Sequence, residues 1–313
     1  MASFVLFNYQ FSKIDDPIEK DLFGNSPVEM DAETAFPQRQ DLFSQLLVED
    51  YEQKRPIKFV GLRGKEYAHQ YVIPPMDNIF VLRISNRRTT TLTNINFQKR
   101  KEADYPYCIV IIDNRSGIQR LAIESKSRVF QIKTLQNILE TALNGVYAMR
   151  RFSLHVELAH LQNSADFWSY ANDTKKYGAG FYKVSFHLPY INLDRLKKAH
   201  QSFLNESRTS FDCKMDIELT ANQGANGRVH LDEKDKFQKG LVCFLMEEVG
   251  GKNILMYPNN NKKRPLVVGA KSFQTIVIPD RTFDQLVLDA KGETLFGSVA
   301  LDEIKCQTKK NIG

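Results

Sequence analysis

The sequence lacks most of the features that identify metal-binding, secreted and membrane proteins. It has only four cysteines in 313 residues, and no two of them form a CxxC pair. This scatter argues against a zinc site and favours free, buried thiols in a reducing compartment. No apolar run approaches the roughly 18 residues of a membrane-spanning helix, and the first residues do not form a signal peptide. We therefore expect a cytoplasmic protein with no membrane association.

Motifs for nucleotide binding and nucleophilic catalysis are missing as well. The glycine-containing turns at 61–64 and 224–227 have neither the spacing nor the strand-to-helix context of a phosphate-binding loop. There is no nucleophile elbow. The six histidines do not form a cluster, since even His155 and His160 would lie on opposite faces of one strand. We expect no cofactor, and the sequence argues against an enzyme without excluding one.

The composition is that of a folded protein with a substantial core. Hydrophobic residues make up 42% of the chain and charged residues 26%, which are ordinary globular values. The length favours two domains, which we place at 1–150 and 151–313. A net charge of +6 permits binding to nucleic acid without requiring it.

One stretch, residues 105–144, anchors the fold prediction. The apolar run at 108–112 predicts a buried strand, the DNRSG sequence at 113–117 predicts a turn, and a second strand follows at 118–124. An amphipathic helix comes next, because apolar residues recur there at helical spacing. These residues are Leu135, Ile138, Leu139, Leu143 and Val146.

The other expected elements complete an α+β fold of antiparallel sheets, a few helices and two strand-rich halves. In the first half we expect a strand at 4–11, a long loop at 12–40, a helix from Asp41 that Pro56 ends, and a strand meander over 57–85. In the second half we expect strands at 152–161, 181–188 and 212–220, a helix at 193–204, a strand or short helix at 239–249, and two strands within 264–280.

The most basic segment is residues 86–104, NRRTTTLTNINFQKRKEAD. One interpretation is a solvated loop between strands, as charge runs usually are. The other is an arm that contacts nucleic-acid phosphates, because Arg, Lys and small polar donors suit that backbone. No helix-turn-helix, zinc finger or RNA-binding sheet motif is present, so we expect binding without sequence preference. The cations of this basic arm are Arg87, Arg88, Lys99, Arg100 and Lys101.

An enzymatic alternative rests on Asp113, Glu124 and Lys126. An Asp at one end of a hairpin, followed by Glu-x-Lys on its second strand, resembles the metal-dependent nucleases of the PD-(D/E)xK class. There, two acidic groups hold Mg²⁺ and the lysine stabilises charge or activates a water. The DNRSG turn also explains Asp113 without catalysis, and short motifs of this kind are common by chance. Mg²⁺ is expected only under this alternative.

The segments CIVIIDNRSGIQRLAIESK and KTLQNILETALN are followed by FSLHVELAHL and FYKVSFHLPYINLDRLKKA. Over about residues 4–290, this order of features resembles that of the RexA-type phage-exclusion proteins and related uncharacterised proteins of phages and mobile elements. The resemblance implies a homodimer that binds double-stranded DNA without sequence preference in bacterial anti-phage defence. Under it, we expect the basic arm together with Arg150 and Arg151 to contact phosphates.

Three functions therefore stay open. A nonspecific DNA binder predicts affinity that falls steeply with salt. A non-catalytic subunit of a larger defence assembly predicts an exposed apolar patch for a protein partner. A nuclease predicts that Asp113, Glu124 and Lys126 lie within a few Å of one another.

Overall fold

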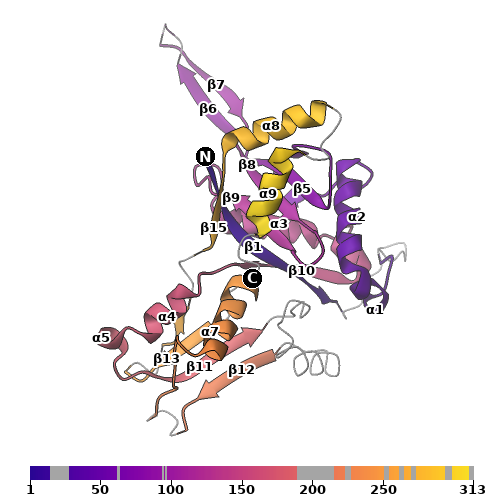
Figure 1. Ribbon diagram of the computed structural model, residues 1–313. Helices are drawn as coiled ribbons and strands as arrows, with labels where there is room; N and C mark the ends of the chain where they lie inside the picture. The colour runs from indigo at the N-terminus through magenta and orange to yellow at the C-terminus, as the bar shows by residue number, and fades with distance from the viewer. Residues whose placement is uncertain are drawn as a thin grey trace. The chain divides into compact units, whose positions relative to one another are not determined.

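The computed structural model describes residues 1–14, 28–61, 64–93, 95, 97–188, 215–222, 227–249, 254–260, 264–268, 273–292 and 298–309. It confirms the α+β class with antiparallel sheets (Figure 1). Contacts divide the chain into two compact units. Unit 1 comprises Met1–Val5, Phe11–Glu157 and Ile276–Lys310, and unit 2 consists mainly of Leu6–Gln10 and Leu158–Thr275. The units differ from the predicted halves, 1–150 and 151–313, because residues 276–309 group with unit 1.

The largest sheet has seven strands in the order β10-β1-β9-β8-β5-β4, with β15 paired to β1. Within it, β5 and β8 pair antiparallel, and their apolar runs are buried on both faces. The DNRSG turn leads from β8 to β9 as predicted. The strands are β1 (Ala2–Lys13), β4 (His69–Tyr71), β5 (Ile79–Ser85), β8 (Tyr107–Asp113), β9 (Arg120–Glu124), β10 (Leu154–His160) and β15 (Thr275–Ile278).

Two helices of unit 1 form at the predicted places in the chain, and each buries an apolar stripe. Helix α2 (Arg39–Tyr51) begins two residues before Asp41 and buries Leu42, Phe43, Leu46 and Leu47. Helix α3 (Ile132–Leu143) buries four of the five predicted residues, but Val146 lies beyond the helix end and is exposed. Short elements complete this part of the unit: α1 (Ala32–Ala35), the 3-10 helices η1 (Phe36–Gln38) and η3 (Met149–Phe152), β2 (Phe59–Val60) and β3 (Glu66–Tyr67).

The expected loop at 12–40 is shorter than predicted, since β1 continues to Lys13 and helix begins at Ala32. Two C-terminal helices, α8 (Asp280–Lys291) and α9 (Val299–Lys309), were not predicted. Helix α9 is held on the DNRSG turn. Its Thr308 hydroxyl donates to the buried Asp113 carboxylate at 2.6 Å, and Arg115 donates to the carbonyl of Lys305 at 2.9 Å.

Unit 2 has a four-stranded sheet in the order β12-β11-β13-β14. Its core is rich in aromatic rings, including those of Phe167, Trp168 and Phe186. The strands are β11 (Phe181–Leu188), β12 (Met215–Thr220), β13 (Ile254–Pro258) and β14 (Leu266–Val267). The helices are α4 (Ala165–Ala171), α5 (Thr174–Tyr177) and α7 (Lys236–Cys243), which continues as the π-helix η6 (Phe244–Val249). The segment 239–249 is therefore helical, and the predicted helix at 193–204 lies outside the described residues.

Two further expectations were free, buried thiols and no membrane-spanning helix. Cys108, Cys243 and Cys306 are free cysteines with buried, half-buried and exposed side chains, in that order, and Cys213 lies outside the described residues. In the part of the chain that the structure describes, no helix has the length and apolar character needed to cross a bilayer.

Candidate nucleic-acid interface

The basic arm is a paired β-ribbon that continues the central sheet. The last pair of β5 and β8 is Ser85 with Tyr107, and the first pair of β6 (Arg88–Thr93) and β7 (Lys99–Asp104) is Arg88 with Asp104. Between them, the backbone N–H of Asn86 donates to the carbonyl of Pro106 at 2.8 Å. One antiparallel register therefore runs from the sheet to the arm. We call β5 with β8 the inner ribbon, and β6 with β7 the outer ribbon.

The outer ribbon is a strand pair without a core. Nearly all of its side chains are exposed, and Figure 1 shows β6 and β7 extending away from the helices and strands of unit 1. Threonine, a β-branched residue that favours extended backbone, occupies four of the six positions of β6. Six residues at about 3.4 Å each make the paired part of the outer ribbon about 20 Å long. The interpretation of this segment as a simple loop is wrong.

The two faces of the outer ribbon carry different charges, because side chains alternate along each strand. On one face, Lys99 lies opposite Thr93 and Lys101 lies opposite Thr91. We call this the Lys–Thr face, and it combines ammonium groups with hydroxyl donors. The other face carries Arg88 and Arg100 together with carboxylates, and the Arg100 Nε is 3.1 Å from the Glu102 Oε1. The Lys–Thr face is thus the more positive of the two.

The base of the outer ribbon is fixed to the turn that follows β9. The Val129 carbonyl accepts hydrogen bonds from the Asn86 Nδ2 at 2.8 Å and from the Arg88 Nη2 at 2.9 Å. The Lys65 Nζ donates to the Asn86 Oδ1 at 2.7 Å. These bonds fix the start of β6, and they bring the exposed Arg128, the neighbour of Val129 in sequence, to the ribbon base.

Further cations meet at Tyr107, at the boundary between the inner and outer ribbons. The Arg83 guanidinium and the Lys126 ammonium each lie 5.1 Å from the centre of the Tyr107 ring. Sequence reasoning missed the contribution of Lys65, Arg83 and Arg128, because they lie in separate segments that the fold brings together. We call the outer ribbon and these base cations the basic surface. Its cations are Lys65, Arg83, Arg87, Arg88, Lys99, Arg100, Lys101, Lys126 and Arg128.

No family model, curated protein or solved structure matches this chain.

Arg151 does not belong to the basic surface. Its side chain is only 1% exposed, and its Nη2 donates to the Glu49 Oε2 at 2.7 Å. Burial alone would raise the pKa of Glu49, but hydrogen bonds from Gln45 and Arg151 and the charges of Arg151 and Arg55 together lower it. Arg151 thus holds η3 against α2, and the expectation that it contacts phosphate is wrong. Arg150 is half-buried in the same 3-10 helix.

The three residues of the nuclease alternative do not converge. Val110 pairs with Ile123, so Glu124 lies opposite Ile109, four residues along β8 from Asp113. Four residues of strand correspond to about 13 Å. Glu124 accepts from the Ile109 backbone N–H at 2.9 Å and pairs with the Lys126 Nζ at 2.7 Å. Its carboxylate is therefore used inside the hairpin.

Asp113 has a structural function at the opposite end of that hairpin. It is fully buried and accepts from the Arg115 Nε at 2.9 Å and Nη2 at 2.7 Å, in addition to Thr308. Among the residues that the structure describes, no group of three or more His, Cys, Asp and Glu side chains is placed to hold a metal ion. The geometry thus gives the Mg²⁺-dependent alternative no support.

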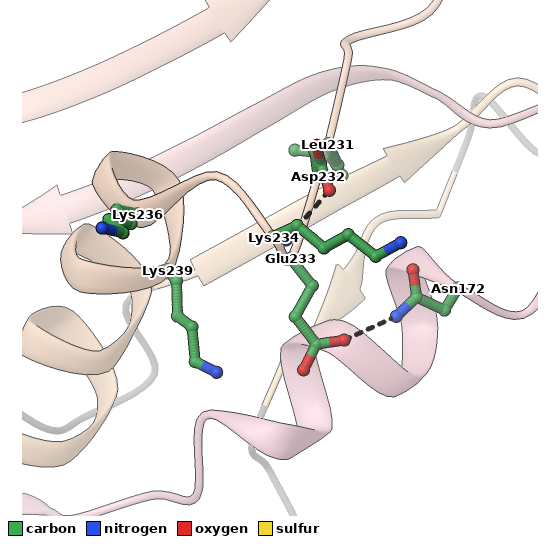
Figure 2. Close-up of a pocket in the computed structure, with 7 residues that line it drawn as sticks. All are labelled: Asn172, Leu231, Asp232, Glu233, Lys234, Lys236 and Lys239. Carbon is green, nitrogen blue, oxygen red and sulfur yellow. Dashed lines mark hydrogen bonds between the residues drawn. The ribbon is translucent and has the colours of Figure 1, made fainter.

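A cavity in unit 2 offers a second place for an anion, but its charges are mixed. Figure 2 shows Lys236 and Lys239 on α7, with Lys234 and Glu233 on the preceding segment. The cavity encloses about 680 Å³, and Asn172 donates to the Glu233 Oε2 at 2.9 Å. Because the carboxylates of Asp232 and Glu233 lie beside the three lysines, the cavity does not present charge of one sign.

A groove in unit 1 has a more apolar wall. It encloses about 740 Å³ between the segment after α2 and the segment after α3. Ile57, Ala142, Val146, Tyr147 and Ala148 supply apolar surface, and Glu29, Arg55 and Lys58 lie among them. Val146 and Tyr147 are both exposed. Such a groove can receive an apolar side chain of a partner.

Proposed function

We propose that the protein binds double-stranded DNA without sequence preference through the basic surface. The observation that carries the proposal is the outer ribbon, a strand pair that stays in register with the sheet yet is exposed and carries a cation or a hydroxyl at eight of its twelve positions. A two-stranded ribbon is narrow enough to enter a groove of B-DNA, and β-ribbon proteins use either the major or the minor groove. Because the outer ribbon buries few of its side chains, it contributes little to the core. Ligand binding is therefore the function that it fits best.

The residue types favour phosphates over bases as the contacts. Lysine ammonium groups and threonine hydroxyls on the Lys–Thr face are suitable donors to phosphate oxygens. Contacts of this kind fix position on the duplex but carry no sequence information. The cations at the base of the outer ribbon, such as Lys65 and Arg128, add positive charge for the neighbouring phosphates of the DNA backbone. The expected binding is therefore electrostatic and sensitive to salt.

The biological setting of this proposal rests on the resemblance to RexA-type proteins. On that resemblance, we propose that the protein acts in the bacterial cytoplasm, in anti-phage defence, as a homodimer. Two copies would present two outer ribbons, which raises the effective concentration of each on one duplex. Light scattering on a size-exclusion column, with and without DNA, measures whether one or two copies are present.

The test is charge reversal on the Lys–Thr face. We expect Lys99→Glu/Lys101→Glu to weaken binding to an arbitrary 30-base-pair duplex by at least about tenfold. The slope of log affinity against log salt should also fall by about 1.8, because each lost phosphate contact removes about 0.9. Fluorescence anisotropy over a salt series gives both numbers.

The matched control is Lys234→Glu/Lys236→Glu, which makes the same charge change at the cavity of Figure 2 in unit 2. We expect it to change affinity by less than about threefold. Equal losses in the two variants would show a general charge effect and contradict the proposal. So would a wild-type protein that binds no duplex at low salt.

A protein-binding subunit is the second candidate function, and the groove of unit 1 is the observation that favours it. The exposed Tyr147 and Val146 lie at this groove beside Ile57. A photo-crosslinking residue in place of Tyr147 should capture one partner in cells, and Val146→Asp should remove that product. If no discrete crosslinked product forms, the groove has no protein partner in cells and this second candidate function is contradicted.

A further inference from the structure

The tip of the outer ribbon carries exposed apolar side chains that folding does not explain. Ile95 is 93% exposed, Phe97 is 87% exposed, and Leu92 just before them is 49% exposed. Large apolar side chains in solvent gain nothing from burial in the fold. In the sequence TNINFQK, the isoleucine and the phenylalanine alternate with Asn and Gln, between two strands of mostly threonines and charged residues. The tip is therefore the part of the arm that exposes large apolar side chains.

The backbone at the tip is also unusual. Phe97 has a φ of 58°, in the left-handed region. A bulky aromatic residue rarely adopts this conformation, and such outliers concentrate at binding sites. Glycine or asparagine would form the same turn with less strain. The sequence thus keeps a phenylalanine at a position that is costly for it.

Cations flank this apolar tip on its C-terminal side. Lys99 follows Phe97 by two residues, and Lys101 lies on the same face of β7 as Lys99. Apolar side chains with cations beside them match a stacked duplex, in which an apolar base stack lies between two lines of phosphates. Proteins that bind the minor groove insert Phe, Leu or Ile between base steps in this way and kink the duplex.

An anionic membrane surface also attracts cations beside aromatic residues, but the tip suits it less well. Interfacial binding depends on a broad apolar face and scales with the area it buries. Here the fully exposed apolar surface is limited to Ile95 and Phe97, and Leu92 lies on the ribbon face that also carries Arg100 and Glu102. A narrow wedge with polar strands behind it fits a gap between base pairs better than a bilayer interface.

We propose that Ile95 and Phe97 insert between neighbouring base pairs and kink the duplex, while Lys99 and Lys101 hold the flanking phosphates. This inference rests on the proposed DNA-binding function and adds the way in which the DNA is deformed. Unstacking costs least at flexible or mismatched steps. The protein should therefore prefer a duplex with one central mismatch, although it reads no base sequence.

The experiment measures bending and binding on the same DNA. An 18-base-pair duplex, about 61 Å long at about 3.4 Å per base pair, carries a donor dye at one end and an acceptor dye at the other, so bending raises energy transfer. We expect the wild-type protein to raise transfer and to bind a singly mismatched duplex about fivefold more tightly than the perfect one. Ile95→Ala/Phe97→Ala should lose at least half of the transfer increase and the mismatch preference, but keep the wild-type slope of log affinity against log salt, because the phosphate contacts remain.

The control is Leu288→Ala/Val299→Ala, which removes two other exposed apolar side chains, from α8 and α9. It should bend DNA as wild type does. A tip variant that bends DNA fully would overturn the wedge and leave DNA binding intact. If the wild-type protein binds DNA without any rise in energy transfer, the wedge is also overturned and DNA binding stands. If the wild-type protein does not bind DNA at all, both proposals are overturned. Sedimentation with phosphatidylserine vesicles that requires Phe97, without DNA bending, would assign the tip to membranes instead.

Discussion

The inner and outer ribbons belong to one antiparallel ladder, yet they have opposite relations to solvent. In the inner ribbon, Leu82 pairs with Val110 and both are buried. In the outer ribbon, Leu92 pairs with Arg100 and both are exposed. The register does not change between them. One continuous register can therefore hold buried pairs and exposed pairs. The side chains of a pair decide whether it joins the core.

This difference also assigns stability to one part and function to the other. An isolated two-stranded hairpin is only marginally stable in water, and cross-strand pairs contribute about 0.2–1 kcal/mol each. The outer ribbon therefore depends on the inner ribbon to start its pairing. Its own side chains, freed from packing, remain available for a ligand.

The largest expected effect comes from shortening the same residue type in the two ribbons. Leu82→Ala should destabilise the protein by about 2–5 kcal/mol, because Leu82 is 1% exposed and its loss leaves a cavity. Leu92→Ala should cost less than about 0.5 kcal/mol, as most surface changes do. Urea unfolding followed by circular dichroism measures both. Similar losses in the two variants would mean that the outer ribbon belongs to the core.

A second contrast compares two aspartates, Asp113 at the far end of the inner ribbon and Asp104 at the base of the outer ribbon. Asp113→Ala should cost about 3 kcal/mol, because it leaves Arg115 without its buried carboxylate partner and frees Thr308. Asp104→Ala, in the exposed outer ribbon, should leave the unfolding free energy within about 0.5 kcal/mol of wild type. Thr308→Val should give an intermediate loss if α9 docks through this bond. If Asp113→Ala leaves the free energy of unfolding unchanged, this aspartate does not hold α9 in place.

Removing the outer ribbon sharpens the comparison further. Residues 87–105 can be replaced by Asn-Gly, a two-residue turn that joins Asn86 to Pro106 in the existing register. We expect a change of at most about 1 kcal/mol in unfolding free energy, because the outer ribbon is exposed and its hydrogen bond from Arg88 to the Val129 carbonyl contributes only modestly. DNA binding should disappear. A shortened protein that binds as wild type does would move the interface elsewhere.

The smallest expected effect is on the chemistry of one thiol. Burial, with the charge of Glu124 adding to it, raises the pKa of Cys108 from an ordinary 9.0 to about 11. At pH 8 about 0.1% of such a thiol is ionised, against about 10% at the ordinary value. Since the folded pKa is the higher one, this group's contribution to stability is complete below pH 9 and is lost between pH 9 and about 11.

Iodoacetamide labelling at pH 8 measures this difference. We expect Cys108 to react at least about 100-fold more slowly than a thiol introduced by Thr90→Cys in the outer ribbon. Mass spectrometry of the peptides distinguishes the two sites from the exposed Cys306. Comparable rates would show that the inner ribbon opens without global unfolding.

The sequence predicted the parts of the fold that bury apolar residues in a regular pattern. The strand at 108–112, the DNRSG turn and the stripe that begins at Leu135 were all recognisable for this reason. The pairing of β6 with β7 was not, because both faces of that ribbon meet solvent and no apolar alternation exists to reveal a strand. The charge of residues 86–104 identified the segment in the sequence, but its form, a paired ribbon, became visible only from the strand register in the structure.

Two errors have the same physical origin. A sequence does not show whether an arginine is buried, so Arg151 looked like Arg88 although it is held inside the fold by Glu49. Nor does it show which distant segment completes a turn, so the nuclease interpretation of Asp113 could not anticipate Thr308. Charge patterns locate candidate surfaces, and tertiary contacts decide which of those charges reach a ligand.

Unit 1 is discontinuous along the chain, and this affects how the protein is made. Residues 276–309 belong to the compact unit that begins at Met1, although residues 158–275 are translated between them. During synthesis on the ribosome, the DNRSG turn therefore emerges long before α9, its partner through Thr308. Domains generally fold as they emerge, but this one has to wait for its last two helices. A fragment that ends near residue 150 is thus an incomplete domain, and it should be prone to capture by chaperones and to aggregation.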